Sequence, residues 1–449
     1  MAKVLITCIG SGKYSSKTDG SQPYRTAEYY INDDKSKTIK SAYVYDALKE
    51  FYSIDKCIFI GTYGSNWHML YEHLYKEDST IVPAEPKNDE LSFELLEINE
   101  SRDKAYKTEP EIAELTSKLQ PIKEAMGSFC ADIVLVKYGL NNEEILENFT
   151  AIAAISNLLS DGDEIYFDIT HSFRSLAFYE LTAVNYFKKA LIKKVKLEFV
   201  AYGMFDFSDE NGGLSPIVDL SKLINVMDYT NAVDEYNRFG TGYLFGELLA
   251  DNRLDYVLTR EAKKAIRRMG DTISTNNFSA FRDLIKICVR VVDNAESRQI
   301  QNIVISHIFK DLADRFGNKL DDPVLLQLEL AKWHFENKRF LACAITISEC
   351  LLNYCASLAD ISLKSLSWEE ELDFRKRIKN ISSDNSQVGD FRASYIKVND
   401  IRNQLAHGDE IDNMAIDKLE KFSKHFMTVY EKHFKNNDTN MNALAKALK

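Results

Sequence analysis

The sequence has few residues that interrupt regular structure, and it has no long apolar run. Only 18 Gly and 7 Pro occur among 449 residues, so we expect most of the chain to form helices and strands. No apolar run reaches the roughly 18 residues that a membrane-spanning helix needs. The first residues enter a strand-like run without a signal peptide. We therefore expect a cytoplasmic protein with no membrane partner.

Cysteine pairs and metal-ligand patterns are also scarce. Seven Cys are scattered along the chain and no CxxC pair occurs, which supports neither a zinc ribbon nor a thioredoxin motif. No His, Cys or carboxylate residues recur at metal-ligand spacing, so we expect no metal and no cofactor. Cys8 and Cys57 lie inside apolar runs, where a reduced thiol behaves as a small hydrophobic side chain.

Positive charge is in deficit, whereas apolar residues are plentiful. The chain has 56 Lys and Arg against 68 Asp and Glu, for a formal net charge of −12. Because phosphate affinity depends on local cationic contacts, this balance predicts weak non-specific adhesion to RNA. Binding of a nucleic acid would therefore depend on a local cluster of basic residues, or on recognition of the ligand's nucleobases rather than its phosphates. Hydrophobic residues make up 45%, enough for the cores of two or three domains.

The first half alternates short apolar runs with longer helical patterns. The expected strands are rich in β-branched or aromatic residues: Val4–Ile9, Cys57–Ile60, Ile133–Val136, Ile165–Asp168, Leu197–Ala201 and Pro216–Asp219. The expected helices lie between them, at Ile39–Phe51, Trp67–Leu74, Glu143–Leu159 and Phe173–Lys188. This alternation predicts a Rossmann-like α/β domain over residues 1–220, with a parallel, doubly wound sheet.

Strand signals nearly stop after residue 220, and helical periodicity dominates the remainder. The expected helices are Leu223–Leu249, Arg260–Met269, Phe278–Val291, Val324–Glu336, Leu341–Leu358, Ile396–Leu405 and Ile416–His433. We divide this part into a helical linker region, residues 221–320, and an all-α C-terminal domain, residues 321–449. The tail from Asn436 onward is expected to fray.

Small polar residues follow one of the expected strands where a helix is about to begin. Asp168 ends the strand, and Thr170, His171 and Ser172 follow it, with Arg174 one turn into the helix. In open α/β sheets, ligands collect at the carboxyl ends of strands, and helix N-termini offer N–H groups to anions. These residues therefore predict a site for a phosphate or a base edge, although Ser and Thr also cap ordinary helices.

Two further strand ends reach the same edge of the predicted sheet. The first carries a glycine-rich loop that includes Gly10 and Ser11. This loop lacks the spacing of a phosphate-binding loop that ends in Gly-Lys-Ser/Thr, so a nucleotide triphosphatase is not supported. The second strand end carries Thr62 and Ser65 just before a helix. We expect all four residues to line the same ligand site.

Three strings in the first half together resemble a known family. They are Asp-Ile-Thr-His-Ser-Phe-Arg-Ser-Leu at 168–176, Gly-Thr-x-x-Ser-x-Trp at 61–67 and Gly-Leu-Asn-Asn-Glu-Glu at 139–144. They resemble the CARF domain of type III CRISPR ancillary proteins over roughly residues 1–220, with departures at Ser172 and Ala177, where Gly and Pro are common. The resemblance implies a domain that binds cyclic oligoadenylate across a homodimer, through the loops after the first strand and around Asp168.

A second candidate site lies near the end of an expected helix in the C-terminal domain. Arg402 and His407 are five residues apart, which corresponds to about 140° around an α-helix. A helix that ends near Ala406, with Gly408 as its stop, would let His407 turn back toward Arg402. Arginine binds phosphate oxygens and offsets transition-state charge, while histidine transfers protons near neutral pH. With the 2′-hydroxyl of RNA as the attacking group, this pair predicts RNA cleavage without a metal.

The Arg–His spacing is not specific by itself, but its setting resembles a second family. His407 is the only His of eight with Arg five residues before it, and Arg-Asn-x-x-x-His in a helical domain resembles the HEPN ribonucleases. This resemblance implies Arg402 and His407 as catalytic residues, with Asn403 orienting the site, in a pair that works across a homodimer. Together the two halves imply an endoribonuclease that cyclic oligoadenylate activates to cut single-stranded RNA in antiviral defence.

Two alternatives stay open. The helical domain can be catalytically idle, which would make the chain a ligand-responsive regulatory or binding protein, although no helix-turn-helix pattern favours this reading. The CARF-like domain can instead act as a ring nuclease that degrades its own activator. Neither the ring size of the activator nor a preference for particular RNA sequences follows from the residues.

Overall fold

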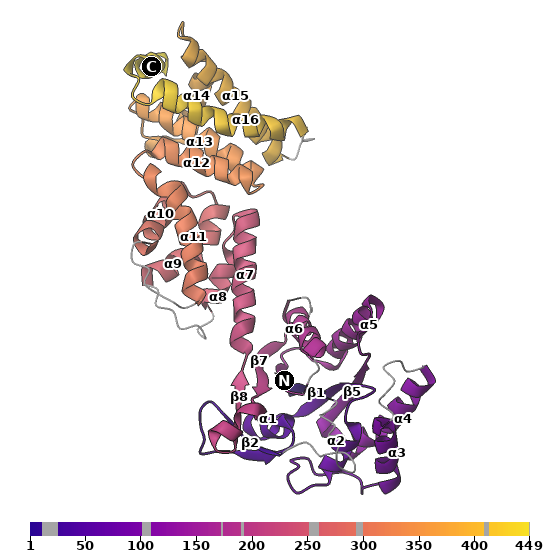
Figure 1. The fold of residues 1–449 in the computed structure, drawn as a ribbon. Coiled ribbons are helices and arrows are strands. Elements are labelled where there is room, and N and C mark those ends of the chain that lie inside the picture. Colours follow the sequence, from indigo (N-terminus) through magenta and orange to yellow (C-terminus); the bar gives the residue numbers. More distant parts are fainter. Residues whose placement is uncertain are drawn as a thin grey trace. The chain divides into compact units, whose positions relative to one another are not determined.

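The computed structural model describes residues 1–10, 26–100, 109–171, 174–189, 193–250, 260–292, 300–407 and 413–448. The chain divides into two compact units, Met1–Asn225 and Val226–Lys449. All strands of the described residues belong to the N-terminal unit, and the C-terminal unit is built of helices (Figure 1). The predicted change from α/β to all-helical structure is therefore confirmed.

The N-terminal unit contains one eight-stranded sheet with the order β3-β2-β8-β7-β6-β1-β4-β5. Its strands are β1 (Lys3–Ile9), β2 (Ala27–Ile31), β3 (Ile39–Ser41), β4 (Lys56–Thr62), β5 (Cys130–Val136), β6 (Glu164–Asp168), β7 (Lys196–Gly203) and β8 (Leu214–Asp219). Strands β7, β6, β1, β4 and β5 pair in parallel. Their carboxyl ends therefore meet at one edge of the sheet, which we call the carboxyl edge.

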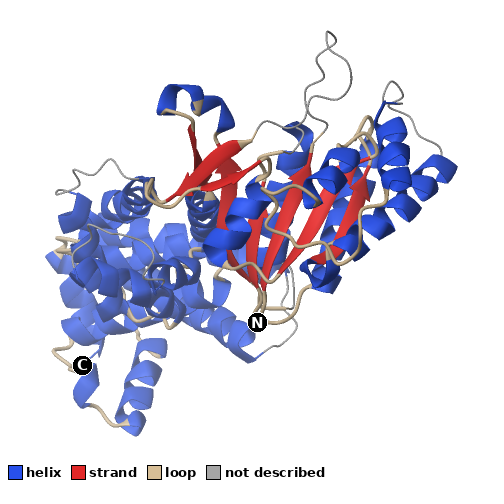
Figure 2. Cartoon of the chain, turned by 90° about the horizontal axis from the view of Figure 1, so that it is seen from below, coloured by secondary structure: helices blue, strands red, loops and turns tan. Residues whose placement is uncertain are grey.

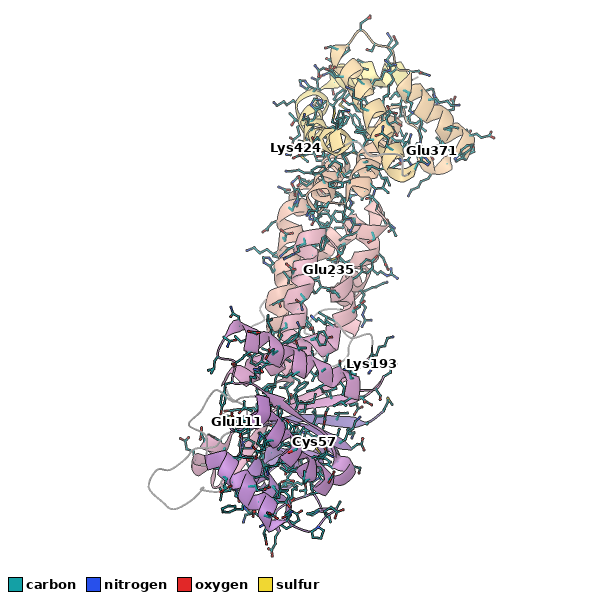
Figure 3. All side chains as sticks on the ribbon, turned by 90° about the vertical axis from the view of Figure 1, so that its right-hand side faces the viewer. Cys57, Glu111, Lys193, Glu235, Glu371 and Lys424 are labelled. Atoms are coloured by element: carbon teal, nitrogen blue, oxygen red, sulfur yellow. The ribbon has the colours of Figure 1, made fainter. Side chains whose placement is uncertain are left out.

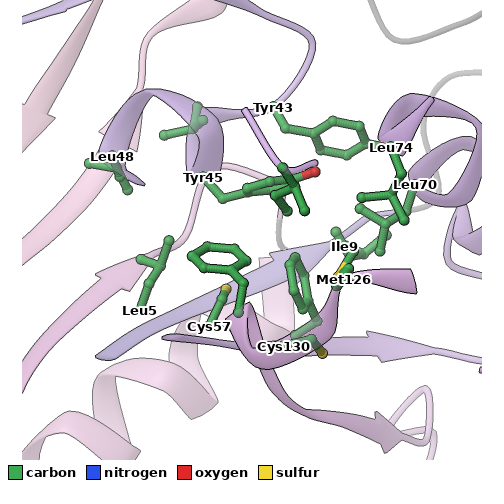
Figure 4. Packing of buried hydrophobic residues seen from close by; sticks show 14 of the residues in the cluster. Leu5, Ile9, Tyr43, Tyr45, Leu48, Cys57, Leu70, Leu74, Met126 and Cys130 are labelled. Atoms are coloured by element: carbon green, nitrogen blue, oxygen red, sulfur yellow. The ribbon is translucent and has the colours of Figure 1, made fainter. Parts of the chain in front are cut away.

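Helices cover both faces of this sheet (Figure 2). They are α1 (Val44–Tyr52), α2 (Trp67–Leu74), α3 (Asp89–Glu100), α4 (Glu109–Ala125), α5 (Asn142–Ala153) and α6 (Arg174–Lys189). Apolar residues of α1 to α4 form a buried cluster with the strands, and Figure 4 shows Tyr43, Tyr45 and Cys57 within it. On the other face, Phe167 of β6 stacks on Phe187 of α6 with ring centroids 6.3 Å apart. The sheet is thus the middle of three layers.

The sheet is mixed rather than wholly parallel. Strands β7 and β8 are antiparallel neighbours, and β2 pairs antiparallel with β3. The prediction of a helix over Ile39–Phe51 is wrong at its start, because β3 comes first and α1 begins only at Val44. The hydroxyl oxygen of Ser41 accepts a hydrogen bond from the N–H of Tyr43 at 3.0 Å. Such a side-chain turn competes with helix formation, so it separates the strand from the helix.

The second half is a series of helices. They are α7 (Ser221–Phe239), α8 (Tyr243–Ala250), α9 (Arg260–Ser274), α10 (Phe278–Val292), α11 (Ile300–Phe316), α12 (Pro323–Glu336), α13 (Phe340–Leu358), α14 (Trp368–Lys379), α15 (Ser386–His407), α16 (Asn413–Val429) and α17 (Asp438–Leu448). One buried cluster joins residues of α7 to α12, and another joins residues of α12 to α17. Helix α12 contributes Trp333 to the first cluster and Leu328 to the second, so it links them.

Helix α13 is the one helix of the described residues that is long and apolar enough to cross a membrane. In the structure it is a core helix, because Ile347, Cys350 and Cys355 have no exposed surface and belong to the second helical cluster. All seven Cys are free and buried. Figure 3 shows one of them, Cys57, inside the N-terminal unit.

The C-terminal tail forms a packed helix, so the expectation that it frays from Asn436 is wrong. Leu444 and Leu448 of α17 are 0% and 1% exposed, and their spacing of four residues places both on one helical face. The side-chain amide of Asn440 donates a hydrogen bond to the carbonyl oxygen of His433 at 2.7 Å. Apolar contact and this hydrogen bond together fasten the end of the chain.

Candidate functional site

Loops of the carboxyl edge meet at Gly10, the residue that follows β1. The carbonyl oxygen of Gly10 accepts a hydrogen bond from the backbone N–H of Asn66, at 2.9 Å, in the loop after β4. A Cβ atom at position 10 would collide with the carbonyl oxygen of His171, in the loop after β6. Glycine is therefore needed where the three loops touch, and the structure brings Gly10 and His171 together.

The loop after β4 is closed by its own polar residues. The hydroxyl of Ser65 donates to the carbonyl oxygen of Ile9 at 2.5 Å and accepts from the N–H of Thr62 at 2.8 Å. The indole N–H of Trp67 donates to the carbonyl oxygen of Thr62 at 2.9 Å. Thr62 and Ser65 are only 3% and 1% exposed. In this structure their side chains therefore fasten the loop to the end of β1 and do not face solvent.

Asp168 has no exposed surface and connects the ends of three strands. Its Oδ2 accepts a hydrogen bond from Oγ1 of Thr7 in β1 at 2.7 Å. Its Oδ1 accepts from the N–H and Oγ1 of Thr170, at 3.0 and 2.6 Å. Thr170 Oγ1 in turn accepts the N–H of Gly203, the last residue of β7, at 2.8 Å. Because hydrogen bonds to a carboxylate are stronger than neutral ones, Asp168 and Thr170 hold this part of the edge in one arrangement.

His171 is a half-buried side chain at the same junction. Its ring meets the ring of Tyr43 at a steep angle, with centroids 5.6 Å apart. Burial lowers the pKa of His171, and the nearby Asp168 carboxylate opposes that shift. A neutral imidazole has one donor and one acceptor nitrogen. His171 therefore has both a donor and an acceptor on its ring, and its Nε2 is buried in this structure.

A buried thiol and carboxyl group lie against each other between β1 and α6. The thiol of Cys8 donates a hydrogen bond to Oε1 of Glu180. Burial raises the pKa of Glu180 well above its usual range, the Cys8 hydrogen bond lowers it, and the charge of Asp168 raises it again. Sequence reasoning missed Glu180, although its spacing from Ala183 and Phe187 is that of one helical face, and both of those residues are buried.

Three of the predicted binding residues fall wholly or partly outside the described structure. Ser11 and Ser172 lie outside the described residues, and Arg174 begins α6 without a described side chain. Among the residues that are described, no group of three or more His, Cys, Asp or Glu is placed to hold a metal ion.

The string at 139–144 is the start of a helix. The side chain of Asn141 caps α5 by accepting the N–H of Glu144 at 2.9 Å. The Glu144 carboxylate accepts the N–H groups of Gly139 and Leu140, each at 3.0 Å. Gly139 has a φ of +77°, a conformation that favours glycine. This string therefore shapes the loop between β5 and α5.

In the C-terminal unit, Arg402, Asn403 and His407 lie near the end of α15. Nη1 of Arg402 donates a hydrogen bond to Oδ1 of Asn403 at 3.3 Å. Arg402 is half-buried, and it follows the buried Val398 by four residues, on the same helical stripe. Asn403 and His407 are exposed. All three side chains are thus close to the molecular surface at one end of a core helix.

The described part of α15 ends at His407, within one residue of the end predicted near Ala406, and Gly408 lies outside the described residues. The predicted return of His407 toward Arg402 is not found. Alanine favours helix, so nothing in the sequence stops α15 before position 407. Residues five apart on a helix leave it in directions about 140° apart, and within the described chain no hydrogen bond links Arg402 to His407. One copy of α15 therefore does not aim both side chains at the same point.

Comparison with known proteins connects the N-terminal unit to a family. Residues 4–206 match the family described as "CRISPR system endoribonuclease Csx1, CARF domain". CRISPR-associated protein MJ1674 of Methanocaldococcus jannaschii is 27% identical over 420 residues, which cover 91% of this chain and 62% of that relative. The chain therefore spans less than two thirds of the length of this curated relative.

One solved structure also aligns with the whole chain. Enterococcus italicus Csm6 bound to cyclic hexa-2′-fluoro-hexa-dAMP aligns over 100% of this chain and 99% of its own, with 11% identity and a TM-score of 0.32. We draw no conclusion from a TM-score this low. The similarity is judged instead from the family match over residues 4–206 and from the MJ1674 alignment. The range 4–206 includes every strand of the carboxyl edge. Residues 4–206 are thus identified as a CARF domain, and the chain as a whole is similar to a CRISPR-associated protein.

Proposed function

We propose that this chain is a homodimeric endoribonuclease that cyclic oligoadenylate activates to cut single-stranded RNA in type III CRISPR defence. The observation that carries the proposal is the combination, in one chain, of a CARF domain with Arg402, Asn403 and His407 near the surface of a helical unit. The string Arg-Asn-x-x-x-His resembles that of the HEPN ribonucleases, which supports a nuclease role for this unit. The matching family is described as a CRISPR endoribonuclease, which supports the same activity here.

The carboxyl edge is suited to a cyclic nucleotide ligand. Gly10 brings the backbone of the loop after β1 against His171, and helix α6 begins three residues later. Helix N-termini and loop N–H groups bind phosphates, while a neutral imidazole can read a base. Buried Asp168, with the hydroxyls of Thr62, Ser65 and Thr170, would keep these loops in a binding arrangement.

A dimer would complete both sites. One α15 sends Arg402 and His407 in different directions, so two copies are needed to surround one phosphate with two Arg–His sets. The N-terminal unit also exposes apolar side chains on the adjacent helices α5 and α6, where Leu146 and Phe178 are 67% and 71% exposed. Large exposed apolar side chains favour contact with another protein surface, which supports pairing of the CARF domains.

The chemistry would use the RNA's own 2′-hydroxyl as the nucleophile. His407 would transfer the proton between that hydroxyl, or the departing 5′-oxygen, and solvent. Arg402 would bind the scissile phosphate and offset the negative charge that grows on it. Asn403, which already accepts a hydrogen bond from Arg402, would hold the guanidinium in place. The products would be a 2′,3′-cyclic phosphate, or a 3′-phosphate, and a 5′-hydroxyl.

The direct test is to incubate the purified chain with a fluorescent single-stranded RNA, with cyclic tetra-adenylate or cyclic hexa-adenylate, in the presence of EDTA. We expect cleavage that requires one of the two activators and survives EDTA, with the ends named above. A requirement for Mg²⁺ would contradict the mechanism. Binding of an activator without cleavage would show an idle helical unit, and consumption of the activator would show a ring nuclease.

A further inference from the structure

Tyr43, at the start of α1, links the carboxyl edge to the interior of the N-terminal unit. Its ring lies 5.6 Å from the ring of His171 and 4.9 Å from the ring of His73 in α2, measured between centroids. Both Tyr43 and His73 are 1% exposed, and Figure 4 shows Tyr43 within the buried cluster. A single buried ring therefore touches the candidate ligand residue on one side and a buried histidine on the other.

His73, which contacts the Tyr43 ring on the side away from His171, is held by the buried carboxylate of Asp46. Nε2 of His73 lies 2.6 Å from Oδ2 of Asp46, which has no exposed surface. Asp46 also accepts hydrogen bonds from Oγ of Ser41 at 2.6 Å, and from Oγ1 and the N–H of Thr80 at 2.5 and 3.1 Å. These donors come from β3, α2 and the segment after α2. Because breaking a buried hydrogen bond leaves an unsatisfied polar group, these hydrogen bonds of Asp46 hold the Nε2 side of the His73 ring in place.

The backbone on which Tyr43 sits is fixed as well. The N–H of Tyr43 donates to Oγ of Ser41 at 3.0 Å. A Cβ atom at Gly203 would lie only 2.7 Å from Cγ2 of Val44 and 3.3 Å from Cγ2 of Thr170. The start of α1 is therefore packed against the end of β7, beside the loop that carries Thr170 and His171. The backbone that carries the Tyr43 ring is therefore held in place on both sides.

We propose that Tyr43 is a positioning residue for the ligand site, and that it holds the imidazole of His171 in its binding orientation with the His73–Asp46 pair as its support. This inference rests on the proposed function, because it takes His171 as a contact to the cyclic oligoadenylate. Tyr43 is buried and does not touch the ligand itself. It raises affinity because a ring that is already oriented loses less freedom when the ligand binds.

Tyr45 provides a matched control on the same helix. It is also 1% exposed, and its ring lies 6.3 Å from the ring of His73 and 5.3 Å from that of Phe59. Within the described residues, the ring contacts of Tyr45 involve Tyr43, His73 and Phe59 and do not reach His171. Loss of the Tyr45 ring should therefore disturb the core as much as loss of the Tyr43 ring, without releasing His171.

The experiment compares Tyr43→Leu, Tyr43→Phe and Tyr45→Leu for thermal stability and for affinity toward labelled cyclic tetra-adenylate and cyclic hexa-adenylate. We expect Tyr43→Leu to weaken binding about two- to tenfold, the range of one aromatic contact, and Tyr43→Phe to bind like the wild type. Tyr45→Leu should lose comparable stability and keep its affinity. If Tyr43→Leu does not fold, Tyr43→Met and Tyr45→Met make the same comparison.

A double-mutant cycle with His171→Ala separates this inference from the proposed ligand site. If Tyr43 acts through His171, the double variant binds no more weakly than His171→Ala alone. Wild-type affinity in His171→Ala would show that the ligand site itself is assigned wrongly. Weakened binding in His171→Ala with full affinity in Tyr43→Leu, or an equal loss in Tyr45→Leu, would overturn the positioning role.

Discussion

Individual residues at the carboxyl edge show what a motif can and cannot reveal. The sequence drew attention to Thr62, Ser65 and Asp168, and the structure places all three where neighbouring strands end. It also shows that their oxygen atoms are already engaged within the protein. Small polar residues at a strand end serve equally well to bind a ligand or to fix a loop, because buried polar groups need partners in either case. Residue type and spacing alone do not separate the two roles.

Two residues that the sequence reasoning missed lie directly beside the motif residues. Tyr43 was hidden inside an expected helix, so its place in a strand-to-helix turn was not foreseen. Glutamate is rarely buried in proteins, and only the apolar positions around Glu180 indicate that this one is buried. Both contacts are between segments far apart in the chain. Such contacts follow from the packing of the layers, and no local pattern encodes them.

The catalytic assignment leads to a prediction about single side chains. His407→Ala should lower RNA cleavage by about 10²-fold or more, the typical contribution of a general acid or base. Arg402→Ala should have an effect of similar size, because it removes charge stabilisation at the phosphate. His425→Ala is the control, since His425 is an exposed histidine of the same unit. The measurement is the rate of RNA cleavage by the wild type and the three variants at saturating activator. A normal rate in His407→Ala would contradict the mechanism.

At the scale of helices and strands, periodicity predicted several helices closely but missed others, among them α3, α4 and α11. The expected Trp67–Leu74 and Leu341–Leu358 helices agree with α2 and α13 to within one residue at each end. The short strands β2 and β3 were missed, because a run of three to five residues has too few alternations to stand out. Helix α14 was missed too, although the capping box of Ser367 and Glu370 that begins it is readable in the sequence.

The junction of α9, α10 and α12 contains a histidine that depends on being neutral. Nε2 of His334 donates to Oδ1 of Asn276, in the turn between α9 and α10, at 3.2 Å. Its Nδ1 is buried without a hydrogen-bond partner among the described residues. Burial, and secondarily the Arg339 cation, lower the pKa of His334 to about 3. A second proton would therefore be placed on a buried nitrogen that has no acceptor.

This arrangement predicts an acid sensitivity of the C-terminal unit. Because the pKa is lowered in the folded state, the unfolded chain binds the extra proton first, at its ordinary pKa of about 6.5. His334 should therefore reduce the free energy of unfolding by about 1.4 kcal/mol for each pH unit below that value, until about pH 3. We expect His334→Gln to show a shallower loss between pH 7 and 5 in urea unfolding. Exposed His425→Gln is the control, and equal slopes in the wild type and His334→Gln would contradict the prediction.

At the scale of the whole molecule, the two halves of the chain were foreseen for different reasons. The α/β half follows from alternation of strands and helices, and its resemblance to CARF domains follows from strings that lie within the matched residues 4–206. The helical half follows from periodicity, but the arrangement proposed for catalysis does not, since α15 directs Arg402 and His407 to different sides. A catalytic site built from two copies of a chain cannot be recognised in one sequence, which shows only half of its residues. Coupling between the proposed ligand-binding and nuclease domains cannot be read from one sequence either.

Control of one half by the other requires that the activator bind more tightly to the cutting conformation than to the resting one. Coupling free energies of this kind are typically about 1–3 kcal/mol, which changes an affinity about 5–150-fold. His171→Ala should weaken the activator's contact without changing Arg402 or His407. The His171→Ala variant should therefore need more activator for half-maximal cleavage, and its cleavage rate should equal that of the wild type when activator is in excess.

The reciprocal variant tests the same coupling from the catalytic side. His407→Ala removes a proton-transfer group and no contact at the carboxyl edge, so it should bind cyclic oligoadenylate as the wild type does while cutting no RNA. Light scattering near twice the chain mass of 51.4 kDa for the wild type and both variants would show that assembly is unchanged. A lower maximal rate in His171→Ala with excess activator would mean that His171 contributes to the switch as well as to affinity. Full cleavage by the wild type in the absence of any activator would contradict the coupling, because a sensor that changes no equilibrium cannot control the nuclease.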